Sequence, residues 1–188
     1  MKKILTLLIA IATLFSFAGC GAPGPDKTVS GMLDALKNWD TAALAGYIDV
    51  DQLYADANIA SENQDQMTEI LKLIMKNLSY EILDTQVSGD TAVVTVSITN
   101  TNMSVVMTEY FTNVLALAFS GNYSTDAELE SAAYDLLQTS IQNHMDQTIT
   151  NQVDVQLTKQ DGQWVPTMSD ELIDAIYGGM ISATQNLY

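Results

Sequence analysis

The chain has no arginine, and its seven basic residues, all of them lysine, are set against 23 acidic residues. The formal net charge is −16 over 188 residues. Binding to nucleic acid requires a basic surface that neutralises phosphates, and arginine reads phosphates and bases best. The composition therefore argues against nucleic acid as a partner. Because 47% of the residues are hydrophobic, the acidity belongs to a folded domain rather than to a disordered tail.

Cysteine and histidine each occur once, as Cys20 and His144. A single cysteine cannot form an intramolecular disulfide, so packing alone must stabilise the fold. Zinc sites use three or four cysteine, histidine or carboxylate ligands, and phosphate-binding loops are rich in glycine; the sequence has neither pattern. The Gly-x-Ser-x-Gly turn of serine hydrolases is also absent. We therefore expect no metal and no other cofactor, and we assign no catalytic residue.

Residues 1–19 have the pattern of a secretory signal peptide. Lys2 and Lys3 supply the positive start, residues 4–17 form an apolar segment, and Ala18 and Gly19 are the small residues typical of a cleavage point. The apolar segment is short for a bilayer core of about 30 Å at about 1.5 Å per helical residue, so we expect no permanent membrane span. The sequence predicts export and removal of this segment.

The cysteine follows the predicted signal peptide directly. Phe17-Ala18-Gly19-Cys20 resembles the lipobox of bacterial lipoproteins, although leucine is commoner than phenylalanine at its first position. The resemblance implies that Cys20 becomes the lipid-modified, palmitate-bearing first residue of the mature protein. The alternative is an ordinary secretory signal with an incidental cysteine. Residues 20–26 are rich in glycine and proline and are expected to tether an acidic domain to the extracytoplasmic face of the cell membrane.

Residues 27–188 are predicted to form a single domain. Apolar spacing of three and four residues alternates with stretches in which every second residue is apolar, so helices and strands are both expected. Helices gathered on one side of an antiparallel sheet make the fold class α+β. Predicted helices cover residues 28–39, 41–48, 61–78, 103–119, 125–145 and a last segment from 170, and predicted hairpins cover 80–98 and 149–165.

Three helix details follow from the same patterns. Residues 103–119 are apolar nearly all round, which predicts a helix that is buried on most sides. Ser61 to Gln64 and Thr125 to Glu128 match the capping box, in which a hydroxyl and a carboxylate or amide satisfy the first free N–H groups of a helix. The sequence therefore predicts that one helix begins at Ser61 and another at Thr125.

Three segments carry a resemblance to a known fold: residues 36–43 (LKNWDTAA), 89–96 (GDTAVVTV) and 161–165 (DGQWV). With the lipobox, they make the chain similar to small lipoproteins of Gram-positive bacteria with a nuclear-transport-factor-two-like domain, a cone of helices and a curved antiparallel sheet. The helical pair between the two hairpins is an addition to the plain cone. The resemblance implies a single-membrane host and a ligand pocket or active site in the mouth of the curved sheet.

Five residues are candidates for ligand binding: Trp39, Tyr47, Asp84, Tyr110 and His144. Enzymes of the cone fold present an acid, a histidine or a tyrosine to the cavity, and Asp84 is the strand acid that could point inward. Exposure at a strand end explains Asp84 as well. A half-buried place near a helix C-terminus explains His144 without a function, and aromatic residues at helical spacing are commonly core.

These observations favour a non-enzymatic module that is held at the membrane by the Cys20 lipid and that binds a small ligand or an envelope protein. The alternative is a cone-fold enzyme of lyase, isomerase or hydrolase type. That alternative requires at least two of Asp84, Tyr110 and His144 to converge in a deep pocket, whereas an apolar, filled cone would count against it.

Overall fold

The computed structural model describes residues 22–48, 61–119, 123 and 125–185. The predicted signal peptide and Cys20 lie outside the described residues. The fold is α+β, with helices packed against a four-stranded antiparallel sheet. In chain order the elements are α2 (Pro25–Asn38), α3 (Thr41–Leu44), η2 (Ser61–Asn63), α5 (Gln64–Met75), β1 (Ser79–Ser88), β2 (Thr91–Thr101), α6 (Met103–Ala118), α7 (Asp126–Asn143), β3 (Thr148–Gln160), β4 (Gln163–Pro166), α8 (Asp170–Ile176) and α9 (Met180–Gln185).

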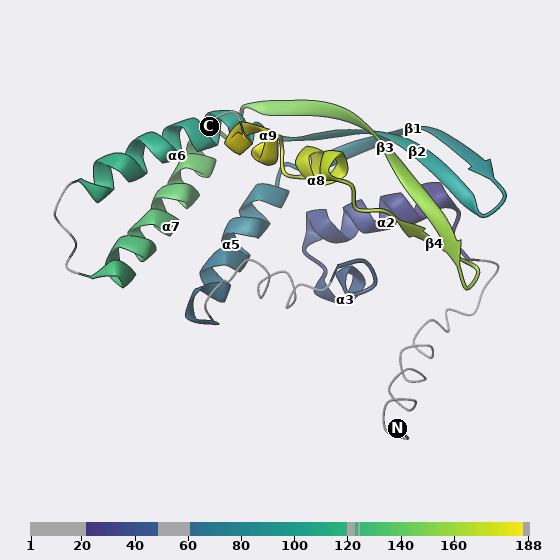
Figure 1. Ribbon diagram of the computed structural model, residues 1–188, viewed down its shortest axis with the longest axis horizontal. Coiled ribbons are helices and arrows are strands. Elements are labelled where there is room, and N and C mark those ends of the chain that lie inside the picture. Colours follow the sequence, from purple (N-terminus) through teal and green to yellow (C-terminus); the bar gives the residue numbers. More distant parts are fainter. Residues whose placement is uncertain (1–21, 49–60, 120–122, 124, 186–188) are drawn as a thin grey trace, which may run out of the picture.

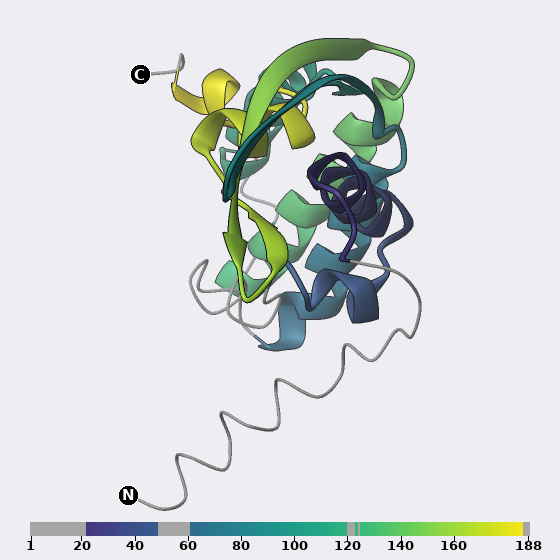
Figure 2. The ribbon, with the colours of Figure 1, turned by 90° about the vertical axis from the view of Figure 1, so that its right-hand side faces the viewer.

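The sheet is open and has the strand order β1-β2-β3-β4. Its strands are strongly curved, and the helices lie beneath one face while the other face is uncovered (Figures 1 and 2). β2 and β3 are opposed along their whole length, from Thr91 opposite Thr158 to Thr101 opposite Thr148. The α6–α7 pair is therefore inserted between two neighbouring strands, as the sequence predicts.

The core lies between the covered face of the sheet and the helices α2, α5 and α8. Alternate residues of β2 and β3 point to it, which is the half-buried pattern expected from the sequence. We call the sheet with these three helices the body. Fully or almost fully buried apolar side chains of the body include Val29, Met32 and Leu33 on α2, Ile70 and Ile74 on α5, Ala92, Val94, Val96 and Ile98 on β2, Val155 and Leu157 on β3, and Leu172 and Ile176 on α8.

The helix starts follow local capping chemistry, with two departures from the predictions. Asp40 caps α3, since its Oδ1 accepts from the N–H groups of Ala42 and Ala43 at 3.1 Å. The predicted capping box at Ser61 is wrong, because Ser61–Asn63 form a 3₁₀ turn and α5 starts at Gln64 without a side-chain cap. α2 begins at Pro25, inside the predicted tether, because proline suits the first turn of a helix.

The α6–α7 pair, which we call the hairpin, is joined firmly to the body at its base. The N–H of Asn102 donates to the carbonyl of Gln147 at 2.8 Å, and the N–H of Met103 donates to the carbonyl of Gly178 at 2.9 Å. Gly178 has φ +58, and a Cβ there would lie 1.9 Å from the carbonyl oxygen of Thr101. Only glycine fits this close approach without a backbone shift.

The far end of α6 is exposed, so the prediction that this helix is buried on most sides is wrong. Met103, Val106 and Met107 are buried near its start, whereas Leu115 is 60% exposed and Phe119, the residue after its last turn, is 86% exposed. The reason is that α6 packs against α7 and α9, and no other described helix or strand forms a layer over its outer side. Within the described ranges, no helix combines the length and apolar character needed to cross a membrane.

Candidate functional site

The structure does not bring the five candidate residues together. Trp39 ends α2 with a left-handed backbone at φ 49, and Tyr47 follows α3; both pack against the core from its edge. Asp84 is exposed on the edge strand β1, next to a β-bulge, and accepts a hydrogen bond from the side chain of Gln86. Tyr110 lies on α6 against Phe111. One of the five, His144, lines the surface groove of the described residues, and the other four do not line this groove.

The burial of two of these tyrosines has a direct consequence for their chemistry. Partial burial raises the pKa of Tyr47 and the pKa of Tyr110 above 10, because the phenolate is poorly solvated there. Both phenols are therefore neutral at physiological pH. As neutral groups they can donate a hydrogen bond or pack against an apolar surface, and they are unsuited to act as a general base.

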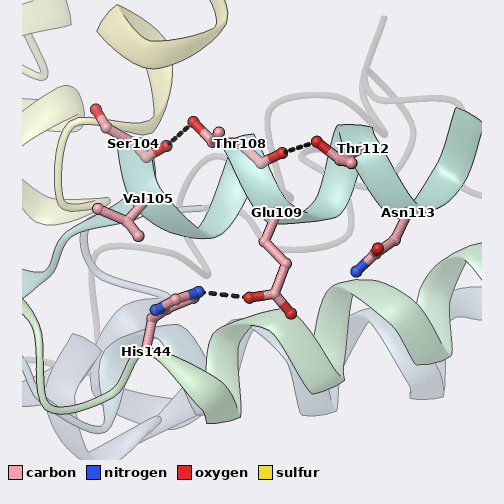
Figure 3. A pocket seen from close by; sticks show the side chains of 7 residues that line it. All are labelled: Ser104, Val105, Thr108, Glu109, Thr112, Asn113 and His144. Atoms are coloured by element: carbon pink, nitrogen blue, oxygen red, sulfur yellow. Dashed lines mark hydrogen bonds and ion pairs between the residues drawn. The ribbon is translucent and has the colours of Figure 1, made fainter.

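The groove runs along the exposed side of α6 and ends at His144, the C-cap of α7 (Figure 3). It has a volume of about 550 Å³ and is open to solvent. Six of its seven lining residues are polar, but most of the surface that they expose to the groove is apolar. The hydroxyls of Thr108 and Thr112 are already used, since each donates to the carbonyl four residues earlier at 2.8 Å. The lining residues are Ser104, Val105, Thr108, Glu109, Thr112, Asn113 and His144.

The centre of the groove is a hydrogen bond between its two titratable side chains. The Nε2 of His144 lies 2.5 Å from an Oε2 of Glu109, and both side chains are largely covered, with exposed fractions of 17% and 29%. The other carboxylate oxygen of Glu109 accepts from Nδ2 of Asn143 at 2.9 Å. The Nδ1 of His144 lies 2.9 Å from the side-chain nitrogen of Gln147. Both ring nitrogens thus have protein partners.

These hydrogen bonds decide the ionisation of Glu109. The bonds from Asn143 and His144 hold the pKa of Glu109 below its usual value of 4.5, so the carboxylate is ionised at neutral pH. With Nε2 donating to Glu109 and Nδ1 accepting from Gln147, the imidazole presents no unpaired nitrogen to the groove. In this arrangement the pair holds α6 to the end of α7 and offers a fixed, negatively charged polar surface.

The covered face of the sheet is lined mainly by apolar side chains of β2 and β3 that are buried in the core. The buried polar side chain of β2, Asn100, is satisfied, since its Nδ2 donates to the carbonyl of Ile176 at 2.7 Å and its Oδ1 accepts from the N–H of Thr101 at 2.8 Å. Along these strands the core therefore occupies the face where the resemblance implied a pocket. Neither Asp84 nor Tyr110 lines the groove with His144. Over the described part of the chain, no three His, Cys, Asp or Glu side chains are grouped so that they could hold a metal ion.

Glu109 was missed by reasoning from the sequence. It is the single charged residue between Thr91 and Thr125, a stretch of otherwise polar and apolar side chains. A lone carboxylate on an apolar helix needs a hydrogen-bond partner when it is partly buried. That requirement, together with the single histidine of the chain on the next helix, was the signal that could have paired Glu109 with His144.

No protein-family model matches the chain, and no curated protein matches it. Among solved structures, it is similar to a crystal structure of YcdA, a candidate lipoprotein of Bacillus subtilis, with 19% sequence identity and a TM-score of 0.45. The similarity covers 94% of this chain and 54% of that chain. This chain therefore spans about half the length of that protein.

Proposed function

We propose that this protein is a lipid-anchored lipoprotein on the extracytoplasmic face of the cell membrane, where it acts as a non-enzymatic binding module. The observation that carries the proposal is Cys20, which is the single cysteine of the chain. It follows a positively charged, apolar leader and two small residues, and a glycine- and proline-rich segment comes after it. The helix α2 starts at Pro25, so only a few residues separate the anchor from the fold.

The folded domain supports binding rather than catalysis. The surface groove is lined by hydroxyls and by an ionised carboxylate that already has two hydrogen-bond donors. Catalysis by acid and base needs a group that can take up or release a proton beside the substrate. Both nitrogens of His144 are engaged with Glu109 and Gln147, and the other candidates lie elsewhere, so the groove suits recognition of a polar or cationic ligand.

The finer assignment of the fold belongs to the same proposal. We assign the body to the nuclear-transport-factor-two-like cones, because α2, α3 and α5 precede a curved antiparallel sheet whose first two strands are the antiparallel neighbours β1 and β2. The α6–α7 hairpin is an insertion into that plan. It carries the groove, which moves the expected binding surface from the mouth of the sheet to the inserted helices.

Lipidation is tested by feeding producing cells an alkyne-tagged fatty acid and fractionating their membranes. We expect the label and membrane retention for the natural sequence and for Ala22→Ser, a matched change in the tether. Cys20→Ser should lose the label and appear in the soluble or secreted fraction, because no other cysteine can carry the lipid. An unlabelled protein, or a Cys20→Ser variant that stays on membranes, would contradict the anchor.

Binding through the groove is tested on the purified protein by native mass spectrometry after incubation with an envelope extract of the host. A ligand retained by the protein and by Asp84→Asn, but lost from Glu109→Gln and His144→Ala, would support the groove. Circular dichroism of each variant checks that the fold is intact. Equal retention by all four proteins would place the ligand elsewhere, and turnover of a retained compound would favour an enzyme.

A further inference from the structure

The end of α6 is apolar and uncovered, and this feature is not used by the groove. Leu115 is 60% exposed and Phe119 is 86% exposed, whereas the large apolar side chains of the body are mostly buried. α6 is the outermost helix of the molecule, with α7 between it and α5 (Figure 1). We call Leu115, Ala116, Ala118 and Phe119, all exposed, the apolar end of α6. Neighbouring exposed apolar side chains of this kind mark an interaction surface.

The surroundings of the apolar end are unusually free of charge. The sequence has no charged residue from Tyr110 to Thr125, although the whole chain has 30 and a net charge of −16. Two of the acids of α7 are turned toward η2 and α5, since Glu130 accepts from the side chain of Asn63 at 2.8 Å and Asp135 accepts from Gln66 at 3.2 Å. The apolar end itself therefore offers no charged side chain with which to select a partner.

A second copy of this chain is a poor occupant for the apolar end. There is no lysine between Lys76 and Lys159, and the one histidine of this stretch, His144, is engaged with Glu109 of its own hairpin, so another hairpin brings no free cation to meet the acids of the first. Two molecules of net charge −16 repel each other as they approach. An uncharged apolar phase avoids this repulsion, and the hydrocarbon edge of a zwitterionic bilayer is such a phase.

We infer that the apolar end of α6 inserts into the interfacial layer of the membrane that holds the lipid anchor, and this inference rests on the proposed function. The start of α2 and the end of α6 lie at opposite ends of the long axis of the molecule (Figure 1). An anchor at one end and an apolar contact at the other hold that axis along the membrane.

The contact between the apolar end of α6 and the membrane is weak by itself and is strengthened by the lipid anchor. Two large side chains bury too little apolar area to hold a protein on a membrane by themselves. The lipid at Cys20 makes the second contact intramolecular, with an effective concentration on the order of millimolar, so a weak insertion becomes well populated. Glu128, in the first turn of α7, remains in water and is repelled by anionic headgroups, so we expect insertion to be favoured by zwitterionic lipid.

The test uses the full lipidated protein reconstituted in phosphatidylcholine vesicles, with a nitroxide on a new cysteine. Because the lipid occupies Cys20, Leu115→Cys gives one free thiol on α6, and Leu83→Cys, on the sheet and 46% exposed in the natural chain, is the matched control. We expect the label at position 115 to be open to oxygen and protected from a water-soluble nickel chelate, and the label at position 83 to be open to both. Adding Phe119→Ser should lower the ratio of inserted to non-inserted protein about tenfold.

Each other result has a fixed meaning. Equal nickel access at positions 115 and 83, in protein that stays with the vesicles, would overturn the insertion while leaving the anchor intact. Protection at position 115 that vanishes when the protein is diluted in lipid would assign the apolar end to a second copy and overturn the proposal. Protection that weakens when phosphatidylglycerol is added, and recovers with salt, would support it.

Discussion

Large apolar side chains are buried in the body and exposed at the end of the hairpin. Ile98 and Leu157 in the body are 0% and 1% exposed, while Leu115 and Phe119 at the end of α6 are 60% and 86% exposed. The sequence of α6 is as apolar as that of a core helix, yet only its start is buried, because no element in the described part of the chain covers the rest. Burial is thus a property of the opposing layer, and an apolar helix without such a layer is available for other contacts.

The largest effect should come from emptying the core of the body. Ile98→Ala removes a side chain that is fully buried between the sheet and the helices, and it should lower the free energy of unfolding by about 4 kcal/mol. Leu115→Ala in the hairpin should change the same quantity by less than about 0.5 kcal/mol, because little apolar area is buried there. Urea denaturation measures both, and equal losses would mean that the end of α6 is packed.

The second largest loss in the free energy of unfolding is expected at the junction of the body and the hairpin. Gly178→Ala places a Cβ 1.9 Å from the carbonyl of Thr101 in a backbone with φ +58, and we expect a loss of about 3 kcal/mol. Gly162→Ala is the matched control, since φ is +82 but no atom lies within 4 Å of the new carbon, and it should cost about 1 kcal/mol. Similar losses at both positions would show that conformation alone, without the close approach, decides the effect.

A smaller and local effect is expected from the capping box of α7. Thr125 accepts from the N–H of Glu128 and Glu128 accepts from the N–H of Thr125, both at 3.2 Å. Thr125→Ala should weaken the first turn of α7 by about 1 kcal/mol and speed hydrogen exchange of its amides, with the body unchanged. Thr139→Ala, on the same helix, is the control. Faster exchange throughout the body would mean that the hairpin and the body unfold as one unit.

The weakest effect should be the dependence on pH of the bond between α6 and α7. The pKa of Glu109 is lowered by Asn143 and His144, so the carboxylate stabilises the fold above about pH 4.5 and loses this effect as the pH falls through its folded pKa. Glu109→Gln should lower the urea midpoint at pH 7, and the difference from the natural protein should shrink by pH 3.5. Asp84→Asn controls for the loss of one negative charge. If the difference in urea midpoint between the two proteins stays constant from pH 7 to pH 3.5, the ionised carboxylate of Glu109 is excluded as its source.

The strands of the body and the start of α7 could be predicted from the sequence, because local rules decide them. The alternation of Ala92, Val94, Val96 and Ile98 indicates a strand with one buried face, and Thr125 to Glu128 correctly marks the start of a helix. The start at Ser61 failed because the same pattern also fits a 3₁₀ turn, and only the packing of η2 and α5 distinguishes the two.

The candidate site was harder to predict from the sequence, because it depends on how two helices pack. His144 was singled out as the lone histidine, but its partner Glu109 is 35 residues away on another helix. Its own helix gives no signal for such a contact, since a bond between helices depends on their packing angle and register. Similarly, the exposure of Phe119 depends on the absence of a covering layer, and side-chain hydrophobicity alone predicts the opposite.

The point where the hairpin leaves the sheet has a consequence for how this protein can vary. Thr101 and Thr148 are direct partners in the ladder, so the chain departs from and returns to the same place in the sheet. The length between them can change without altering the register of β2 and β3, and the entropy of closing a loop grows only slowly with its length. Helices of other lengths could be grafted onto Asn102 and Gln147, so the sheet is a fixed frame on which new surfaces can be exchanged.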